Sequence, residues 1–206
     1  MTSPSSNGVI AIFFFKALLC LFPALAVWYW AREWVVLPVA WLAEQAMVFF
    51  FSRWVIGSEL HGVTQTLLTV LTVPHTSGRV AELLPEAVVL TYCYGLPLLV
   101  ALFVAARAKG LWWKLPLCAA ALLPFQAWGV CFSWLLQAGV QAGPYTRAIT
   151  YFSPLDQNLI ALGYQFGFLL MPTLVPLLLW LFFERRFVIT VAVEGAMQGS
   201  VVETEL

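Results

Sequence analysis

The chain has 206 residues, of which 62% are hydrophobic and 10% are charged, and its mean hydropathy is +0.90. A typical soluble domain carries about 25% charged residues, so this composition predicts a polytopic membrane protein. Ten basic and ten acidic residues cancel, which leaves no strong field to attract nucleic acid. The length accommodates one membrane domain with small loops and excludes an additional large soluble domain.

Four stretches are long and apolar enough to cross a bilayer, which takes roughly 20 mostly apolar residues. They cover about 9–30, 88–106, 111–138 and 157–183. Basic residues crowd the connection between the second and third stretches and follow the fourth, and the positive-inside rule places both positions in the cytoplasm. These residues are Arg107, Lys109, Lys114, Arg185 and Arg186.

The stretch 34–56 is apolar but carries Glu44 and Gln45 near its middle, where a carboxylate is costly in hydrocarbon. The loop charges place the following segment, 57–87, on the outer side of the membrane. Because the first span runs from inside to outside, the stretch 34–56 then cannot cross fully. We therefore favour an amphipathic, interfacial or re-entrant helix that lies on the outer leaflet or dips into it. The alternative is a fifth span, with the N-terminus outside.

The segment 57–84 follows on the outer side. Val63–Val73 is rich in Thr, Val and Leu, the PHTSG sequence at 74–78 is a turn signal, and Arg79–Leu84 can pair back. We predict a small external β-hairpin in this segment.

Together these features predict an all-α integral membrane protein with four to five transmembrane helices and a small external β-hairpin. The polytopic membrane domain covers 1–187, and a cytoplasmic tail covers 188–206.

One face of the third clear span carries small and polar residues, at the spacing i, i+3, i+7 and i+11. Such a stripe lets another helix approach closely and hydrogen-bond to it. We predict a helix contact here, either within this protein or with a partner. The residues are Gln126, Gly129, Ser133 and Gln137.

The last span repeats this pattern. Asn158 and Gln165 lie seven residues apart on one helical face, and Gly163 and Gly167 form a Gly-x-x-x-Gly pair. The glycine pair suits close helix packing, so we predict a second contact face on this span.

Cys93 is the candidate for a reactive thiol, because we expect it near the outer membrane interface. A thiol of this kind needs a nearby base or cation to become a thiolate, and His61, His75 and Arg79 lie on the same predicted side. Nothing in the sequence fixes either histidine beside the thiol. The sequence has no zinc-ligand spacing, phosphate-binding loop or hydrolase signature, so we expect no metal site and no cofactor.

Three blocks carry a family resemblance: YCYGLPLLVALFVAAR at 92–107, LLPFQAWGVCFSWLLQ at 122–137 and NLIALGYQFGFLLMPTLVPLLLW at 158–180. Together with WYW at 28–30, they resemble the exosortase H-associated membrane proteins of Gram-negative bacteria. The similarity covers most of the chain up to Phe187. It implies a multi-pass protein of the bacterial inner membrane. It also implies that the protein accompanies a cysteine transpeptidase that reads C-terminal sorting signals on exported proteins.

The chain departs from the pattern of an exosortase itself. That family uses a Cys, then an Arg, then a His in chain order, whereas His61 and His75 here precede Cys93, Cys118 and Cys131. The resemblance implies an accessory to protein sorting but does not supply its molecular role, and our first hypothesis is a non-enzymatic subunit that binds through its polar helix faces. Its partners would be membrane lipid, an exosortase and the C-terminal spans of exosortase substrates.

Two other functions stay open on the residues alone. An enzyme would use Cys93 as an outer-face thiol. A small permease or lipid-handling protein would need a polar cavity lined by Gln126, Asn158 and Gln165.

Overall fold

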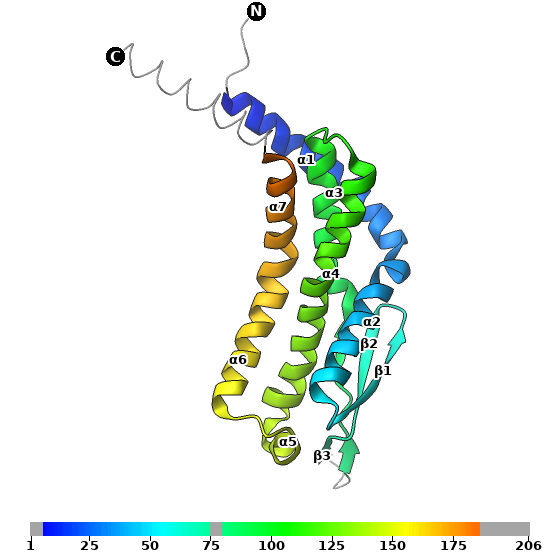
Figure 1. Ribbon diagram of the computed structural model, residues 1–206, viewed down its shortest axis with the longest axis vertical. Helices are drawn as coiled ribbons and strands as arrows, with labels where there is room; N and C mark the ends of the chain where they lie inside the picture. Colours follow the sequence, from blue (N-terminus) through cyan, green and yellow to red (C-terminus); the bar gives the residue numbers. More distant parts are fainter. Residues whose placement is uncertain (1–5, 75–79, 186–206) are drawn as a thin grey trace, which may run out of the picture. The chain divides into compact units, whose positions relative to one another are not determined.

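The computed structural model describes residues 6–74 and 80–185, which form helices and two small antiparallel sheets (Figure 1). The chain divides into two compact units. The first unit comprises Met1–Trp30, Leu96–Ala120 and Pro176–Leu206, and the second comprises Ala31–Gly95 and Ala121–Val175. The predicted tail, 188–206, lies outside the described residues.

The helical elements account for the long apolar stretches of the sequence. The α-helices are α1 (Ser6–Trp30), α2 (Arg32–Phe51), α3 (Gly95–Ala105), α4 (Leu111–Leu135), α5 (Gly143–Thr150), α6 (Pro154–Gln165) and α7 (Met171–Phe183). A 3₁₀ turn, η1 (Val89–Tyr92), precedes α3, and two π-helical segments, η2 (Leu136–Gln141) and η3 (Phe166–Leu170), extend α4 and join α6 to α7.

Four helical stretches in the described part of the chain are long and apolar enough to cross a membrane. They are Ala11–Trp30, Arg32–Phe51, Leu111–Gln141 and Pro154–Phe183, and Val89–Ala105 is a shorter apolar helix. The predicted fold class, a helical membrane protein with a small antiparallel hairpin, is confirmed.

The first unit is held together by aromatic contacts and an ion pair. The Phe13 ring stacks on Trp180 with 5.3 Å between centroids, and Trp113 meets Phe183 edge-on at 5.8 Å. Lys114 of α4 pairs with Glu184, and both side chains are largely buried. Because an unpaired charge in apolar surroundings is costly, each of these two charges stabilises the other.

The sheets lie in the second unit. β1 (Val55–His61), β2 (Thr64–Thr69) and β5 (Glu86–Val88) form one antiparallel sheet in the order β1-β2-β5, and β3 (Thr72–Pro74) pairs with β4 (Val80–Glu82). The β3–β4 pair is the hairpin that the sequence predicted around PHTSG, although residues 75–79 lie outside the described part.

The β1–β2 hairpin was not predicted from the sequence. Its register pairs His61 with Thr64, so Gly62 and Val63 form a two-residue turn, and Gly62 has a φ of 62°. A glycine in the first position of a two-residue turn is a hairpin signal, but a weaker one than Asn-Gly.

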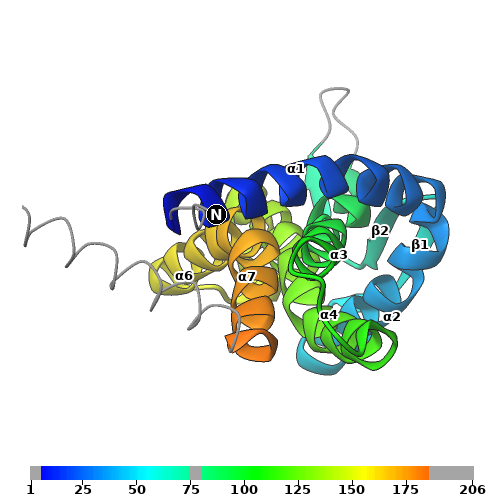
Figure 2. The same ribbon diagram turned by 90° about the horizontal axis from the view of Figure 1, so that it is seen from above.

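The three-stranded sheet packs against α2 (Figure 2), and Trp134 in the part of α4 that belongs to the same unit reaches β2. Gln65 of β2 is buried, and its amide donates hydrogen bonds to the Ala40 carbonyl of α2 at 3.0 Å and to the Ser58 hydroxyl at 2.8 Å. The Trp134 indole of α4 donates to the Gln65 carbonyl at 3.4 Å. Glu44 accepts a hydrogen bond from the Ser58 N–H of β1, which gives this costly carboxylate a partner.

We expect Trp134→Ala to destabilise the protein by about 3–5 kcal/mol, because it removes a fully buried indole and leaves a cavity between α4 and the sheet. Thermal unfolding in detergent micelles, followed by far-UV circular dichroism, measures the change. Trp41→Ala is the matched control, since Trp41 is 63% exposed. Equal losses in the two variants would show that Trp134 does not hold the sheet.

Candidate functional site

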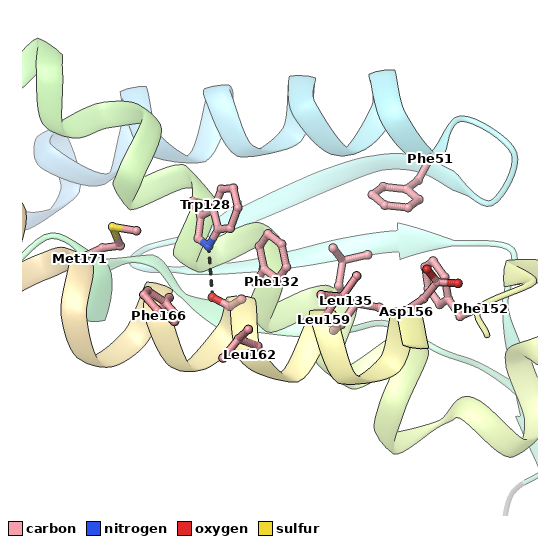
Figure 3. A pocket seen from close by; sticks show the side chains of 12 residues that line it. Phe51, Trp128, Phe132, Leu135, Phe152, Asp156, Leu159, Leu162, Phe166 and Met171 are labelled. Carbon is pink, nitrogen blue, oxygen red and sulfur yellow. Dashed lines mark hydrogen bonds between the residues drawn. The ribbon is translucent and has the colours of Figure 1, made fainter. Parts of the chain in front are cut away.

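The second unit brings α4 and the α6–η3 segment into contact at glycine residues. A Cβ added at Gly167 would lie 2.8 Å from the Gly129 Cα, and a Cβ added at Gly163 would collide with the Phe132 ring. The Trp128 indole donates a hydrogen bond to the Gly163 carbonyl at 3.1 Å (Figure 3). The three glycines named in the sequence analysis, Gly129, Gly163 and Gly167, therefore lie at one close helix contact.

Tyr92 of η1 packs against Gly129 and Ser133, two members of the small and polar stripe on α4. Its ring lies where a Gly129 side chain would be, and its hydroxyl is within hydrogen-bonding reach of Ser133. The ring meets Phe168 of η3 edge-on, with 6.3 Å between centroids. Gly129 and Ser133 thus serve a contact inside this chain.

Gln137, in η2, pairs with the backbone of β5. Its carbonyl accepts from the Glu86 N–H at 3.0 Å, and its amide nitrogen donates to the Glu86 carbonyl at 2.6 Å. These are the two bonds that a neighbouring strand would make, so the side chain completes the edge of the sheet.

Gln126 is the most enclosed member of the stripe. It is 4% exposed, and neither atom of its amide has a hydrogen-bond partner among the described residues. It borders a cavity of about 10 Å³ together with Tyr92, Phe125 and Met171. A space of this size holds at most one water molecule.

Asn158 and Gln165 are placed differently, because both are exposed on α6. They line neither the Gln126 cavity nor two further cavities of about 430 and 400 Å³. The structure therefore does not gather Gln126, Asn158 and Gln165 around one polar space, which is the arrangement that a permease with these residues would require.

Cys93 follows η1 and is fully buried, and its thiol donates to the Val89 carbonyl at 3.3 Å. His61 is exposed at the end of β1, whereas His75 and Arg79 lie outside the described residues. Across residues 6–74 and 80–185, no group of three His, Cys, Asp or Glu side chains is arranged to hold a metal ion.

The structure also shows an apolar trough that the sequence analysis did not identify. Two cavities of about 430 and 400 Å³ share Phe51, Trp128, Phe132 and Leu135. The larger opens toward α6 and the smaller toward α2, and the residues of α4 form a ridge between them (Figure 3). Trp128, Phe132 and Leu135 recur at i, i+4 and i+7, a spacing that indicates one apolar face but not which elements flank it.

Comparison with known proteins identifies one family. The family model described as exosortase H-associated membrane protein matches residues 8–187. No curated protein and no solved structure matches the chain.

We expect Gly167→Ala to lower stability by about 1–3 kcal/mol, because the added methyl group would press on the Gly129 backbone, which has no rotamer by which to escape. Thermal unfolding in detergent measures the loss. Gly57→Ala is the control, since a Cβ there would lie 3.5 Å from the Glu44 carboxylate, an ordinary contact. A Gly167 variant as stable as the control would contradict the close approach of α4 and η3.

Proposed function

The chain belongs to the exosortase H-associated membrane protein family, and from that premise we propose that it is a non-enzymatic accessory of exosortase-dependent protein sorting in the bacterial inner membrane. Its role is to bind the exosortase, or the C-terminal spans of exosortase substrates, through a polar face of α6. The family name supports association with exosortase H.

The observation that carries this proposal is the pair of exposed amides on α6. Asn158 and Gln165 share a helical face with the exposed Leu162 and Leu169. This face belongs to an apolar stretch long enough to cross a bilayer. Hydrocarbon offers no hydrogen bonds to an exposed amide, so the amides favour a helix that supplies them.

The polar stripe on α4 is less suited to a partner, because it is occupied within this chain. Ser133 is close to Tyr92, Gln137 binds the backbone of β5, and Gly129 faces Gly167. Gln126 is enclosed. The α6 face therefore remains as the polar membrane face that a second protein can reach.

The environment of Cys93 supports a non-enzymatic role. The thiol is buried and donates a hydrogen bond to the carbonyl of its own turn. A nucleophilic cysteine needs access to substrate and a neighbouring base. Cys93 is buried, whereas His61 is exposed to solvent at the end of β1.

We expect the double change Asn158→Leu and Gln165→Leu to reduce co-purification with exosortase H in mild detergent by about tenfold, since each lost hydrogen bond is worth roughly 0.6–1.5 kcal/mol in a membrane. The readout is the ratio of the two proteins after affinity capture.

Thr173→Val is the matched control, because Thr173 is an exposed polar residue on the next helix. Its hydroxyl already donates to carbonyl groups of its own helical segment. Unchanged association in the double variant, with a normal control, would refute the α6 face as the binding site.

We also propose that α2 stays on the outer side of the bilayer as an interfacial helix. Its buried face, which includes Val36, Ala40 and Met47, packs in a unit whose strands carry exposed polar residues such as Glu59 and His61. Polar strands beside a helix are poorly compatible with hydrocarbon. Exposed aromatic residues on the opposite side suit the membrane surface; they include Trp34, Trp41 and Phe49.

Single cysteines at Glu33 and Ser52, in a chain whose four native cysteines are replaced, locate both ends of α2. We expect both to react with a membrane-impermeant maleimide applied from outside. Lys109→Cys is the control and should react only after permeabilisation. Labelling of position 52 alone from outside would mean that α2 crosses the bilayer.

A further inference from the structure

We infer that the trough of the second unit is a binding site for one diacyl glycerophospholipid. The two acyl chains would lie in the two cavities, and the phosphate would lie at the end of the trough marked by Phe51 and Phe152. This inference does not depend on the partner proposed for the α6 face.

The shape of the trough suits two chains that meet at one end. The α6-side cavity is lined by Leu159, Leu162, Phe166 and Met171, and the α2-side cavity by Leu42, Ala46, Met47 and Phe50. The ridge residues separate the two cavities. Phe51 lines both of them, and its ring meets Phe152 edge-on, with 6.1 Å between centroids.

The length of the trough matches that of one acyl chain, and the acyl chains of a lipid fill one leaflet. Its α4 side runs from Pro124 to Leu135, which is about 16 Å at the helical rise of ~1.5 Å per residue. Half of a ~30 Å hydrocarbon core is about the same length. Figure 3 shows Met171 at the opposite end of the α6-side cavity from Phe51 and Phe152.

Cationic side chains lie at the Phe51–Phe152 end. The Arg53 guanidinium stacks over the Tyr151 ring at 5.3 Å, and the Arg147 Nε donates to the Phe152 carbonyl at 3.2 Å. Both arginines are exposed, so their remaining N–H groups are available to the oxygens of a phosphate, which guanidinium groups bind well.

Asp156 balances part of this charge. Its carboxylate lines the α6-side cavity and accepts hydrogen bonds from the Ser153 hydroxyl and backbone N–H. Two arginines and one carboxylate leave a net charge of +1 at this end, which complements the single negative charge of a phosphodiester.

A lipid fits the trough better than a partner helix does. A helix of about 10 Å diameter needs small residues along the groove that receives it. Here bulky rings occupy the centre: Trp128 and Phe132 stack with 4.4 Å between centroids. Flexible chains pass on either side of such a ridge.

Native mass spectrometry of the full chain in detergent, titrated with dioleoylphosphatidylethanolamine, tests the site. We expect one tightly retained lipid on the unaltered chain and about tenfold weaker retention after Arg53→Gln with Arg147→Gln. Ala46→Trp and Leu162→Trp each fill one cavity and should weaken retention without changing the charge.

Arg107→Gln is the control, since Arg107 is an exposed arginine in the first unit. Equal retention in every variant, or an equal loss in the control, would overturn the inference. If the double arginine variant does not fold, the two tryptophan variants decide the question. An Ala46→Trp variant that retains lipid but loses exosortase H would identify the trough as a helix site and would also overturn the inference. Leu162→Trp is not used for this readout, because Leu162 also belongs to the α6 face proposed to bind the exosortase.

Discussion

The close approach of Gly129 on α4 to Gly167 on η3 is the constraint on which the second unit depends. With no side chains between them, the two backbones lie near enough for Trp128 to reach the Gly163 carbonyl and for Phe132 to cover Gly163. These rings then stand as a ridge beside the contact, and α6 and α2 form the walls of the two cavities on either side of that ridge. A larger residue at either glycine would separate the helices and remove the geometry of the trough.

A second constraint comes from glutamine side chains, which join the sheet to the helices. Gln65 links β2 to α2, and Gln137 supplies both hydrogen bonds that a further strand would make to Glu86. A chain this apolar has few polar groups to use in this way. Gln65 and Gln137 are therefore already hydrogen-bonded within the second unit. Asn158 and Gln165 of the same unit, by contrast, are exposed on α6. The proposed binding role rests on that difference.

Much of the fold could be predicted from the sequence, because apolar length and turn chemistry are local properties. The membrane class, the long helices and the hairpin around PHTSG were accessible in this way. The partners of individual polar residues were not. Gln137 bonds to Glu86, 51 residues away in the chain, and helical periodicity gives a face without naming what lies opposite it. The trough could not be predicted for the same reason, since α4 supplies its central ridge while α2 and α6, which are distant in the chain, supply its walls.

Photo-crosslinking in the membrane would report which surface of this protein touches the exosortase. A photoreactive residue would replace Gln165 on α6 or, for comparison, the exposed Trp41 on α2, in cells that contain exosortase H. We expect a covalent adduct with exosortase H, or with the C-terminal span of its substrate, from position 165 and a much weaker one from position 41. An adduct from position 41 with none from position 165 would contradict this expectation.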